Sequence, residues 1–229
     1  MSKYSFSKLD LFKQCKRKYK YRYIDKLSGD LILPALVKGK RVHSLLEHFG
    51  TDFKPDFKAS KDEIKEVYDI FNRFTKSPLG KEILEPKSVR EFHIKFDSDL
   101  KPTILKPKFE GYIDRVNVGD SIELIDFKTG KFKESQNYDQ LSIYATWFLQ
   151  KYPKFKSVKL RYVYVEHLKE NTMEFSDFEP VKANVLNIIK QIEAESAFDR
   201  NITPLCDYCD FKSICFKSFN DSELETIRF

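Results

Sequence analysis

One stretch of this 229-residue chain, from Gly111 to Lys131, constrains its fold more than any other. It reads Gly-Tyr-Ile-Asp-Arg-Val-Asn-Val-Gly-Asp-Ser-Ile-Glu-Leu-Ile-Asp-Phe-Lys-Thr-Gly-Lys, which predicts two strands joined by a short turn at residues 119–121. Because side chains alternate between the faces of a strand, Asp126 and Lys128 share one face with apolar residues of the second strand. Charged groups on an apolar face are costly unless something compensates them.

The length of the turn decides where Asp114 lies. A two-residue loop would pair Asp114 with Ile125, whereas a three-residue loop with a glycine-assisted bulge would pair it with Asp126. Two carboxylates at cross-strand distance repel each other, but a divalent cation reverses that interaction, and Lys128 adds a second positive charge. We therefore expect the longer turn and a metal site. The alternative is an ordinary hairpin whose aspartates point to solvent.

The four cysteines form the second informative pattern. Cys206, Cys209 and Cys215 lie close together in the sequence, and Cys15 is the only other thiol. In a reducing compartment such cysteines are more often ligands than disulfides, and four thiolates suit an iron–sulfur cluster or a structural zinc. The ligands of a zinc site usually come as two close pairs of residues, so an arrangement of one distant cysteine and three close ones favours an iron–sulfur cluster. Zinc and free thiols stay open as alternatives. A cluster would tie the first helix to the last segment and close a very long loop.

Charge and hydropathy narrow the class of protein. Lys and Arg number 41 against 35 Asp and Glu, a formal net charge of +6, and the excess is clustered, which suggests a polyanionic partner. No apolar run approaches membrane-spanning length, and the N-terminus has no signal-peptide core, so we expect a soluble cytoplasmic protein with no membrane partner. The chain has no G-x-x-x-x-G-K-[ST] loop and hence no nucleotide-driven motor of its own.

Much of the basic excess lies in a predicted helix that begins at a Ser7 cap and runs to about Tyr23. Its basic residues alternate with tyrosines, a mixture that suits the backbone and bases of a nucleic acid. A solvated basic helix is the alternative. The candidate DNA-binding residues are Lys13, Lys16, Arg17, Lys18, Lys20 and Arg22.

The remaining segments alternate between helical and strand patterns. Helices are expected at 39–49, 60–77, 135–151 and from Pro180, and strands at 91–97 and 156–166. His43 lies on the flank of the first of these helices, one turn before Glu47, where a histidine is more often structural than a ligand.

These motifs together resemble the PD-(D/E)xK nuclease superfamily, specifically the iron–sulfur members of its RecB-like branch, such as the AddB nuclease domain and CRISPR-associated single-domain exonucleases. The matching motifs are G-x-x-x-H at Gly39–His43, G-x-x-D at Gly111–Asp114, D-x-K at Asp126–Lys128, Q-x-x-x-Y at Gln140–Tyr144, and the cluster cysteines with their C-x-x-C-x-x-x-x-x-C spacing. The chain departs from the family in lacking a proline before Asp114 and in having Lys16 where a proline often follows the first cysteine.

The resemblance implies an α/β (α+β) fold with a restriction-endonuclease-like core, in which helices flank a central mixed β-sheet. It implies one nuclease domain over 1–229. Residues 31–199 would form the core, and 1–30 with 200–218 a lobe in which the terminal segments join at a 4Fe–4S cluster.

The implied function is hydrolysis of DNA phosphodiesters by a water bound to Mg²⁺ or Mn²⁺, in an exonuclease that acts on single-stranded ends. His43, Asp114, Asp126 and the carbonyl of Phe127 would hold the metal, and Lys128 would position the water. Gln140 and Tyr144 would fix the DNA strand or the lysine, and the cluster would be structural.

Other roles are compatible with the same motifs. The main alternative is a non-catalytic DNA-binding or assembly subunit with a structural cluster, and a third is a redox sensor on a nuclease scaffold. DNA is the implied partner, together with a helicase or a recombination or CRISPR-adaptation protein. Glu91 corresponds loosely to an acidic residue upstream of the hairpin, and its role is left open.

Overall fold

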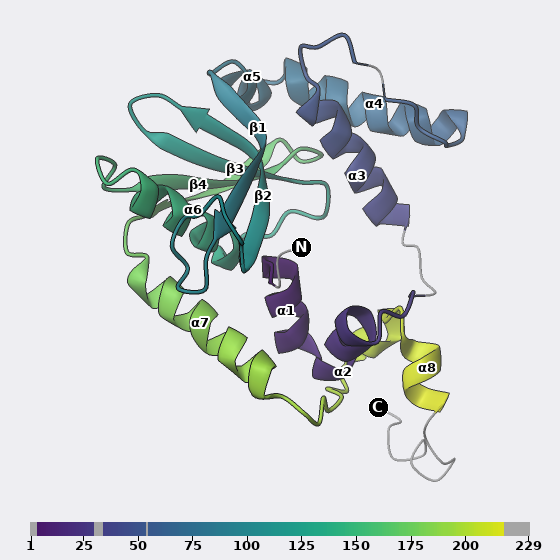
Figure 1. Cartoon of the computed structure of the whole chain (residues 1–229). Coiled ribbons are helices and arrows are strands. Elements are labelled where there is room, and N and C mark those ends of the chain that lie inside the picture. The colour runs from purple at the N-terminus through teal and green to yellow at the C-terminus, as the bar shows by residue number, and fades with distance from the viewer. Residues whose placement is uncertain (1–3, 30–33, 54, 218–229) are drawn as a thin grey trace.

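A single five-stranded mixed sheet organises the protein (Figure 1). The structure, a computed structural model, describes residues 4–29, 34–53 and 55–217 of the chain. The strand order is β1-β2-β3-β4-β5, and all neighbours are antiparallel except β3 and β4, which α6 connects in parallel. The strands are β1 Ser88–Phe96, β2 Phe109–Val118, β3 Ile122–Lys128, β4 Val158–Tyr164 and β5 Lys169–Phe175. The predicted mixed sheet is confirmed.

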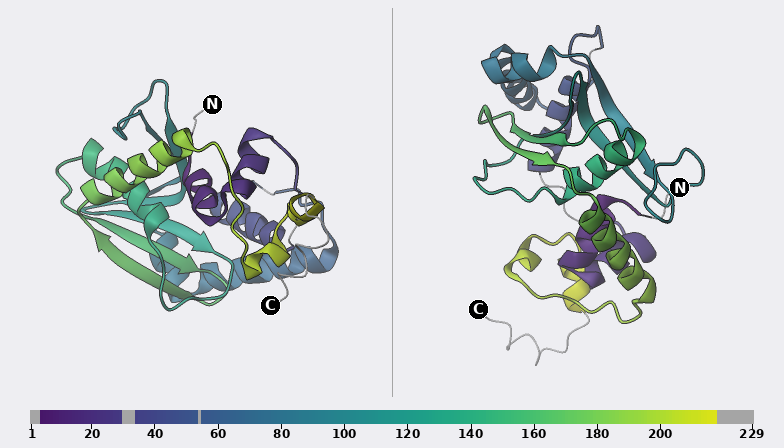
Figure 2. Two further views of the ribbon diagram at one scale, coloured as in Figure 1. Left: turned by 90° about the horizontal axis from the view of Figure 1, so that it is seen from below. Right: turned by 90° about the vertical axis from the view of Figure 1, so that its left-hand side faces the viewer.

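Helices cover both faces of the sheet. Helices α1, α6 and α7 bury one apolar cluster against it, and α3, α4 and α5 bury a second on the opposite face (Figures 1 and 2). The helices are α1 Phe6–Gln14, α2 Lys16–Tyr19, the π-helical η1 Lys20–Ile24, α3 Pro34–Glu47, α4 Lys61–Lys76, α5 Pro78–Leu84, α6 Asp139–Lys151, α7 Glu179–Ala194, the 3₁₀ segment η2 Pro204–Tyr208 and α8 Lys212–Lys217. Among the described residues, no helix combines the length and apolar character needed to cross a membrane.

The β2–β3 turn has the predicted three-residue length. Val118 pairs with Ile122, and this register, followed along the strands, sets Asp114 opposite Asp126. The ladder stops one step earlier, at Arg115 and Ile125, so the two strands part where the aspartates lie. The glycine-assisted bulge was wrong, because neither Gly119 nor the residues that follow it in the turn have a positive φ.

The N-terminal helix differs from the prediction at both ends. Ser5, rather than Ser7, is the N-cap, and its side chain accepts a hydrogen bond from the Lys8 amide. The helix then breaks at Cys15, whose backbone is extended (φ −160°, ψ 112°), before α2 and η1 carry the chain on. The break turns the Cys15 thiol to where the amide of Asn201 approaches it at 3.5 Å.

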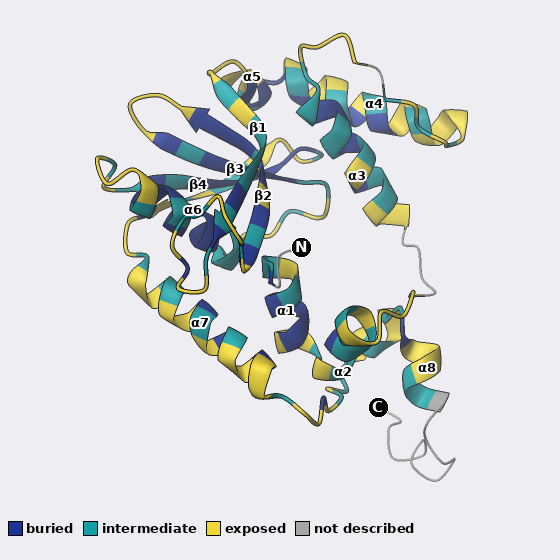
Figure 3. Cartoon of the chain, viewed as in Figure 1, coloured by how far each residue is buried: buried dark blue, intermediate teal, exposed yellow. Residues whose placement is uncertain are grey.

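Helix α2 and η1 lie beside the segment that follows α7 (Figure 1). Tyr19 of α2 stacks on Phe198 with ring centroids 6.4 Å apart, and Lys16 Nζ lies 2.5 Å from Glu195 Oε2. The buried surface of α1 continues into the main core, whereas the described residues of η1 and α8 are intermediate or exposed (Figure 3). Residues 1–3, 30 and 218 of the predicted terminal lobe lie outside the described residues.

Candidate active site

A cavity of about 610 Å³ lies between α3 and the sheet. It opens where β2 and β3 part, so the carboxylates predicted to hold a metal lie in its wall. The lining residues that matter here are His43, Glu91, Asp114, Asp126, Lys128 and Gln140.

Within this cavity the hairpin and α3 bring four predicted site residues together. Asp114 Oδ2 accepts a hydrogen bond from the Phe127 amide at 2.7 Å and lies 3.4 Å from His43 Nδ1. Lys128 Nζ lies 2.6 Å from Asp126 Oδ2. This close ion pair does not have hydrogen-bond geometry, so Asp126 Oδ2 is a buried oxygen without a hydrogen bond.

The charges in the cavity perturb one another. Burial, followed by repulsion from Asp114, raises the pKa of Asp126 to about 6, although Lys128 acts in the opposite direction. Burial by itself would lower the pKa of His43, but the hydrogen bond and charge of Asp114 and the charge of Asp126 reverse that effect and raise it. Two carboxylates and a histidine are thus held in a buried site with an excess of negative charge, which favours a bound cation.

Two glycines permit the close approaches that build the site. A Cβ on Gly39 would lie 2.8 Å from Thr129 Oγ1, so the glycine lets α3 pass close to the end of β3 and brings His43 to Asp114. A Cβ on Gly111 would lie 2.5 Å from Cε1 of Tyr144. These contacts explain physically why glycines begin both motifs.

Gly111→Ala should disturb the site because the ring of Tyr144 is buried and cannot simply move aside. We expect a loss of about 1–3 kcal/mol in the free energy of unfolding, typical of overpacking, measured by urea denaturation. Gly119→Ala is the matched control, since nothing lies within 4 Å of its added Cβ and its φ is negative. Equal stability of the two variants would contradict the proposed close contact.

Of the two residues of the Q-x-x-x-Y motif, one lines the cavity and the other is buried in the core. Gln140 lines the cavity, and its Nε2 lies 3.5 Å from the hydroxyl of Tyr144. Tyr144 is buried against Gly111 and is not among the residues that line the cavity. Its side chain therefore supports Gln140 from behind. Phe127 lines the cavity and packs its ring edge-on to His43; the metal contact of its carbonyl stays a prediction.

The structure also brings in residues to which the sequence gave no role. Glu91 lies in the cavity with φ +46°, and burial, followed by the charges of Asp114 and Glu47, raises its pKa to about 7. Lys40 lines the cavity from an exposed position on α3. Its place three residues before His43 was the available signal, because residues three apart share a helix face.

All six predicted DNA-binding residues have partners within the protein. Five of the six pair with carboxylates, three of these pairs join the N-terminal segment to Glu195 or Asp210, and the pairs are partly exposed. The partners are Asp139 for Lys13, Glu195 for Lys16, the Phe198 carbonyl for Arg17, Asp210 for both Lys18 and Arg22, and Asp25 for Lys20. Their contact with DNA stays a prediction, and the structure gives them a packing role.

The four cysteines line one small cavity between α2, η2 and α8, and none forms a disulfide. Burial raises the pKa of the Cys215 thiol; Arg200 opposes this, while the other three cysteines add to it. Within the described ranges, no three His, Cys, Asp or Glu side chains are arranged to hold a metal ion, here or between the aspartates.

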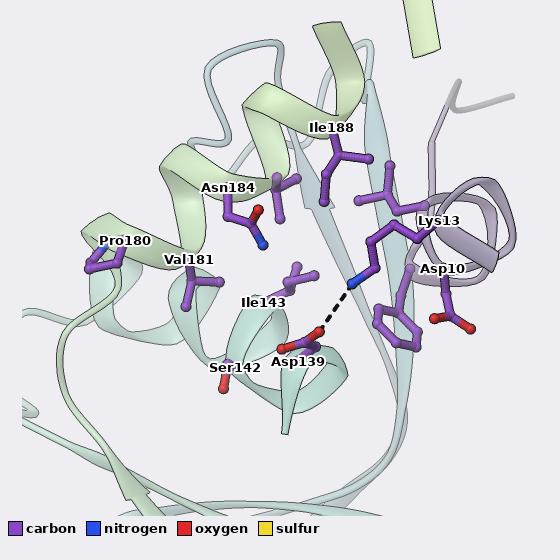
Figure 4. A pocket seen from close by; sticks show the side chains of 12 residues that line it. Asp10, Lys13, Asp139, Ser142, Ile143, Pro180, Val181, Asn184 and Ile188 are labelled. Carbon is purple, nitrogen blue, oxygen red and sulfur yellow. Dashed lines mark hydrogen bonds and ion pairs between the residues drawn. The ribbon is translucent and has the colours of Figure 1, made fainter. Parts of the chain in front are cut away.

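A separate apolar cavity of about 210 Å³ lies between α1, α6 and α7 (Figure 4). Its wall carries Ile143, Val181 and Ile188, with the Lys13–Asp139 ion pair at 3.3 Å on one side. It shares no lining residue with the cavity that contains Asp114 and Asp126, so it is not part of the candidate active site.

Comparison with known proteins agrees with this geometry. None of the curated proteins compared matches the chain. The crystal structure of a protein from Eubacterium rectale, provisionally assigned as an exonuclease, has a TM-score of 0.58 and 14% sequence identity, with 97% of this chain and 92% of that one covered. The crystal structure of SSO0001 has a TM-score of 0.46 and 14% identity, with 94% and 86% covered. The sequence model described as the PD-(D/E)XK nuclease superfamily matches residues 3–216, and the chain belongs to this superfamily.

Proposed function

We propose that this nuclease hydrolyses DNA phosphodiesters with a divalent cation and acts as an exonuclease on single-stranded ends. The observation that carries the proposal is the convergence of Asp114, Asp126, Lys128 and His43 on one cavity. The likeness in fold to the Eubacterium rectale protein, which is provisionally assigned as an exonuclease, supports the choice of activity.

The donor set fits a hard divalent cation. Carboxylate oxygens are the ligands that Mg²⁺ and Mn²⁺ prefer, and an imidazole nitrogen adds some preference for Mn²⁺. Asp126, Asp114 and His43 would hold such an ion, with Lys128 Nζ moving away from Asp126 Oδ2 and His43 Nδ1 turning from Asp114 Oδ2. When bound, the cation supplies Lewis-acid chemistry that strengthens water as a nucleophile and offsets charge on the phosphate.

The protein groups around that position have distinct roles. Lys128 Nζ, next to Asp126, places a positive charge where negative charge develops on the phosphate during attack. The Phe127 amide fixes Asp114 through its hydrogen bond and so sets the direction of the second carboxylate. Lys40, on the wall of the cavity, is placed to bind a flanking phosphate of the strand.

Lys128→Ala should lower the cleavage rate of an end-labelled single strand in Mn²⁺ by roughly 10²–10³-fold, because it removes the charge that stabilises the transition state. Lys131→Ala, in the exposed loop that follows, is the control and should leave the rate unchanged. Full activity of the Lys128 variant would contradict the catalytic role and favour a DNA-binding subunit.

We also propose that the cysteines hold a 4Fe–4S cluster and that 1–30 and 200–218 form one lobe on a nuclease core of 31–199. Four thiols around one cavity provide the donor chemistry, and a cationic centre would relieve the repulsion among their thiolates. The two segments of the lobe are already joined by contacts such as Lys18–Asp210 at 2.9 Å, so the cluster would add to an existing interface.

Cys209→Ser should abolish iron binding and lower the melting temperature of anaerobically purified protein. The variant loses a ligand that links the two ends of the chain, and therefore a constraint on the unfolded state. Iron content and thermal unfolding, measured on the same samples, test this. Stoichiometric zinc in place of iron, or unchanged iron and melting temperature in the variant, would contradict the cluster.

A further inference from the structure

An exposed aromatic pair lies next to the catalytic carboxylates on the same strands. His93 of β1 and Tyr112 of β2 are register partners, and their rings stack with centroids 4.2 Å apart and an interplanar angle of 15°. Glu110 Oε2 holds His93 Nε2 at 3.1 Å, so the pair is anchored from one side. Tyr112 is nevertheless 53% exposed.

The position of this pair is fixed by the register. The register of the pairs on either side, Arg90 with Arg115 and Phe92 with Ile113, sets Glu91 opposite Asp114, two residues further along each strand. Two residues of a strand span roughly 7 Å, so Tyr112 lies about one nucleotide from Asp114. The neighbouring residues Phe92 and Ile113 turn toward the core on the α6 side, so His93 and Tyr112 face the opposite side, from which α3 brings His43.

One face of the Tyr112 ring is stacked on His93, which lies on the β1 side. On the opposite side of β2, β3 pairs only from Arg115 onward, and the next described pairing of β2 on that side is between Phe109 and Tyr4. No described strand therefore pairs with β2 at Tyr112 on that side, and 53% of Tyr112 is exposed.

The charged residues around Tyr112 favour contact with a base rather than with a phosphate. Glu91 and Glu110 flank the aromatic pair, so a phosphate placed on it would meet carboxylates. The flat, uncharged face of a base would meet only the tyrosine ring. Bases stack on exposed aromatic side chains regardless of sequence, with about 1–3 kcal/mol for each base.

We propose that Tyr112, backed by His93, stacks a base of the DNA strand next to the phosphate in the active site. This inference rests on the proposed nuclease function and adds a substrate-positioning residue to it. Stacking requires an unpaired base, so the platform favours single-stranded DNA over a duplex, in which both faces of an internal base are already stacked.

The test uses full-length protein and a set of end-labelled single strands, each with one abasic nucleotide at a different position. With wild-type protein, one abasic position near the cleaved bond should raise KM about 10-fold, since 1.4 kcal/mol corresponds to a factor of ten. Tyr112→Ala should raise KM about 10-fold on the intact strand and show no further loss at that position. Tyr112→Phe should behave like the wild type.

Phe53→Ala is the matched control, because Phe53 is also 53% exposed and stacks on His48 with centroids 3.9 Å apart, but lies between α3 and α4 rather than on the strand that carries Asp114. Its KM should not change. If Tyr112→Ala raised KM over the wild-type value by the same factor on the intact and on the abasic strand, the inference would be overturned. Wild-type kinetics for Tyr112→Ala would overturn it as well. No cleavage of any strand by the wild type would instead contradict the proposed nuclease function.

Discussion

Asp126→Asn should raise the free energy of unfolding of the metal-free protein. The same substitution should abolish the stabilisation that added metal gives the wild type. The pKa of Asp126 is raised to about 6 in the folded state, chiefly by burial. Because the pKa of this carboxyl is higher in the folded than in the unfolded protein, its ionisation at pH 8 lowers the free energy of unfolding. This destabilisation is absent below the pKa of the unfolded state, where the carboxyl is protonated in both states. Asparagine removes the charge, so we expect a gain on the order of 1–3 kcal/mol in the free energy of unfolding at pH 8.

The same variant should lose the stabilisation that Mn²⁺ gives the wild type, because a ligand that binds only the folded state stabilises it in proportion to its affinity. Thermal unfolding with and without Mn²⁺ measures both effects. Asp120→Asn, at an exposed position in the β2–β3 turn, is the control and should change neither. A metal-induced shift that survives in Asp126→Asn would place the ion elsewhere.

Arg161→Leu should produce the largest loss of stability of any substitution considered. Its side chain is 2% exposed and forms ion pairs with Glu170 (2.7 Å), Glu82 (2.8 Å) and Glu123 (3.3 Å), so it links α5 and three strands beside the site. Removing one partner of a buried ion pair costs about 3–5 kcal/mol, because the remaining charge is left uncompensated. Urea denaturation should show a loss of about 3 kcal/mol, since the carboxylates keep partial access to solvent.

Lys159→Leu is the matched control for Arg161. It lies on the same strand and pairs with the same Glu123 at 3.5 Å, but its side chain is 34% exposed. Exposed pairs contribute about 0–1 kcal/mol, so the control should change little. Similar losses in the two variants would contradict the assignment of Arg161 as the buried centre of this network.

The sequence predicted the elements whose signals are local. The helix expected at 60–77 forms as α4, and a capping box starts it, in which the Glu63 side chain accepts a hydrogen bond from the Ser60 amide. The three-residue hairpin loop, expected because of the charges of Asp114 and Asp126, is present, and both aspartates line one cavity. The spacing of the cysteines likewise anticipated that four thiols line one cavity.

Other features depend on contacts between distant residues or on weak local patterns. Helix α5 was missed because Pro78 was taken as the end of α4, whereas Ser77 ends one helix and caps the next. The edge strand β5 is mostly polar, with Met173 and Phe175 as its apolar residues, so it lacks a strong alternation. Helix α6 begins at Asp139, four residues later than predicted, after a loop that carries Gln136 to Tyr164.

The residue types of the candidate site could be predicted from the sequence, but the contacts that hold these residues in place could not. The left-handed backbone of Glu91 and the network around Arg161 follow from tertiary packing, and the partners of Arg161 are 9, 38 and 79 residues away. The ion pairs of the basic N-terminal residues with Glu195 and Asp210 could not be foreseen either, because the chain must fold before its two ends meet.

The most direct measurement is the Mn²⁺-dependent cleavage of an end-labelled single strand by the wild type and by Asp126→Asn, purified side by side. We expect cleavage by the wild type only with the metal, and a rate at least about 100-fold lower for the variant, which corresponds to a few kcal/mol of lost transition-state stabilisation. Equal rates for the two proteins, or wild-type cleavage that persists in a metal chelator, would contradict catalysis at this pair of aspartates.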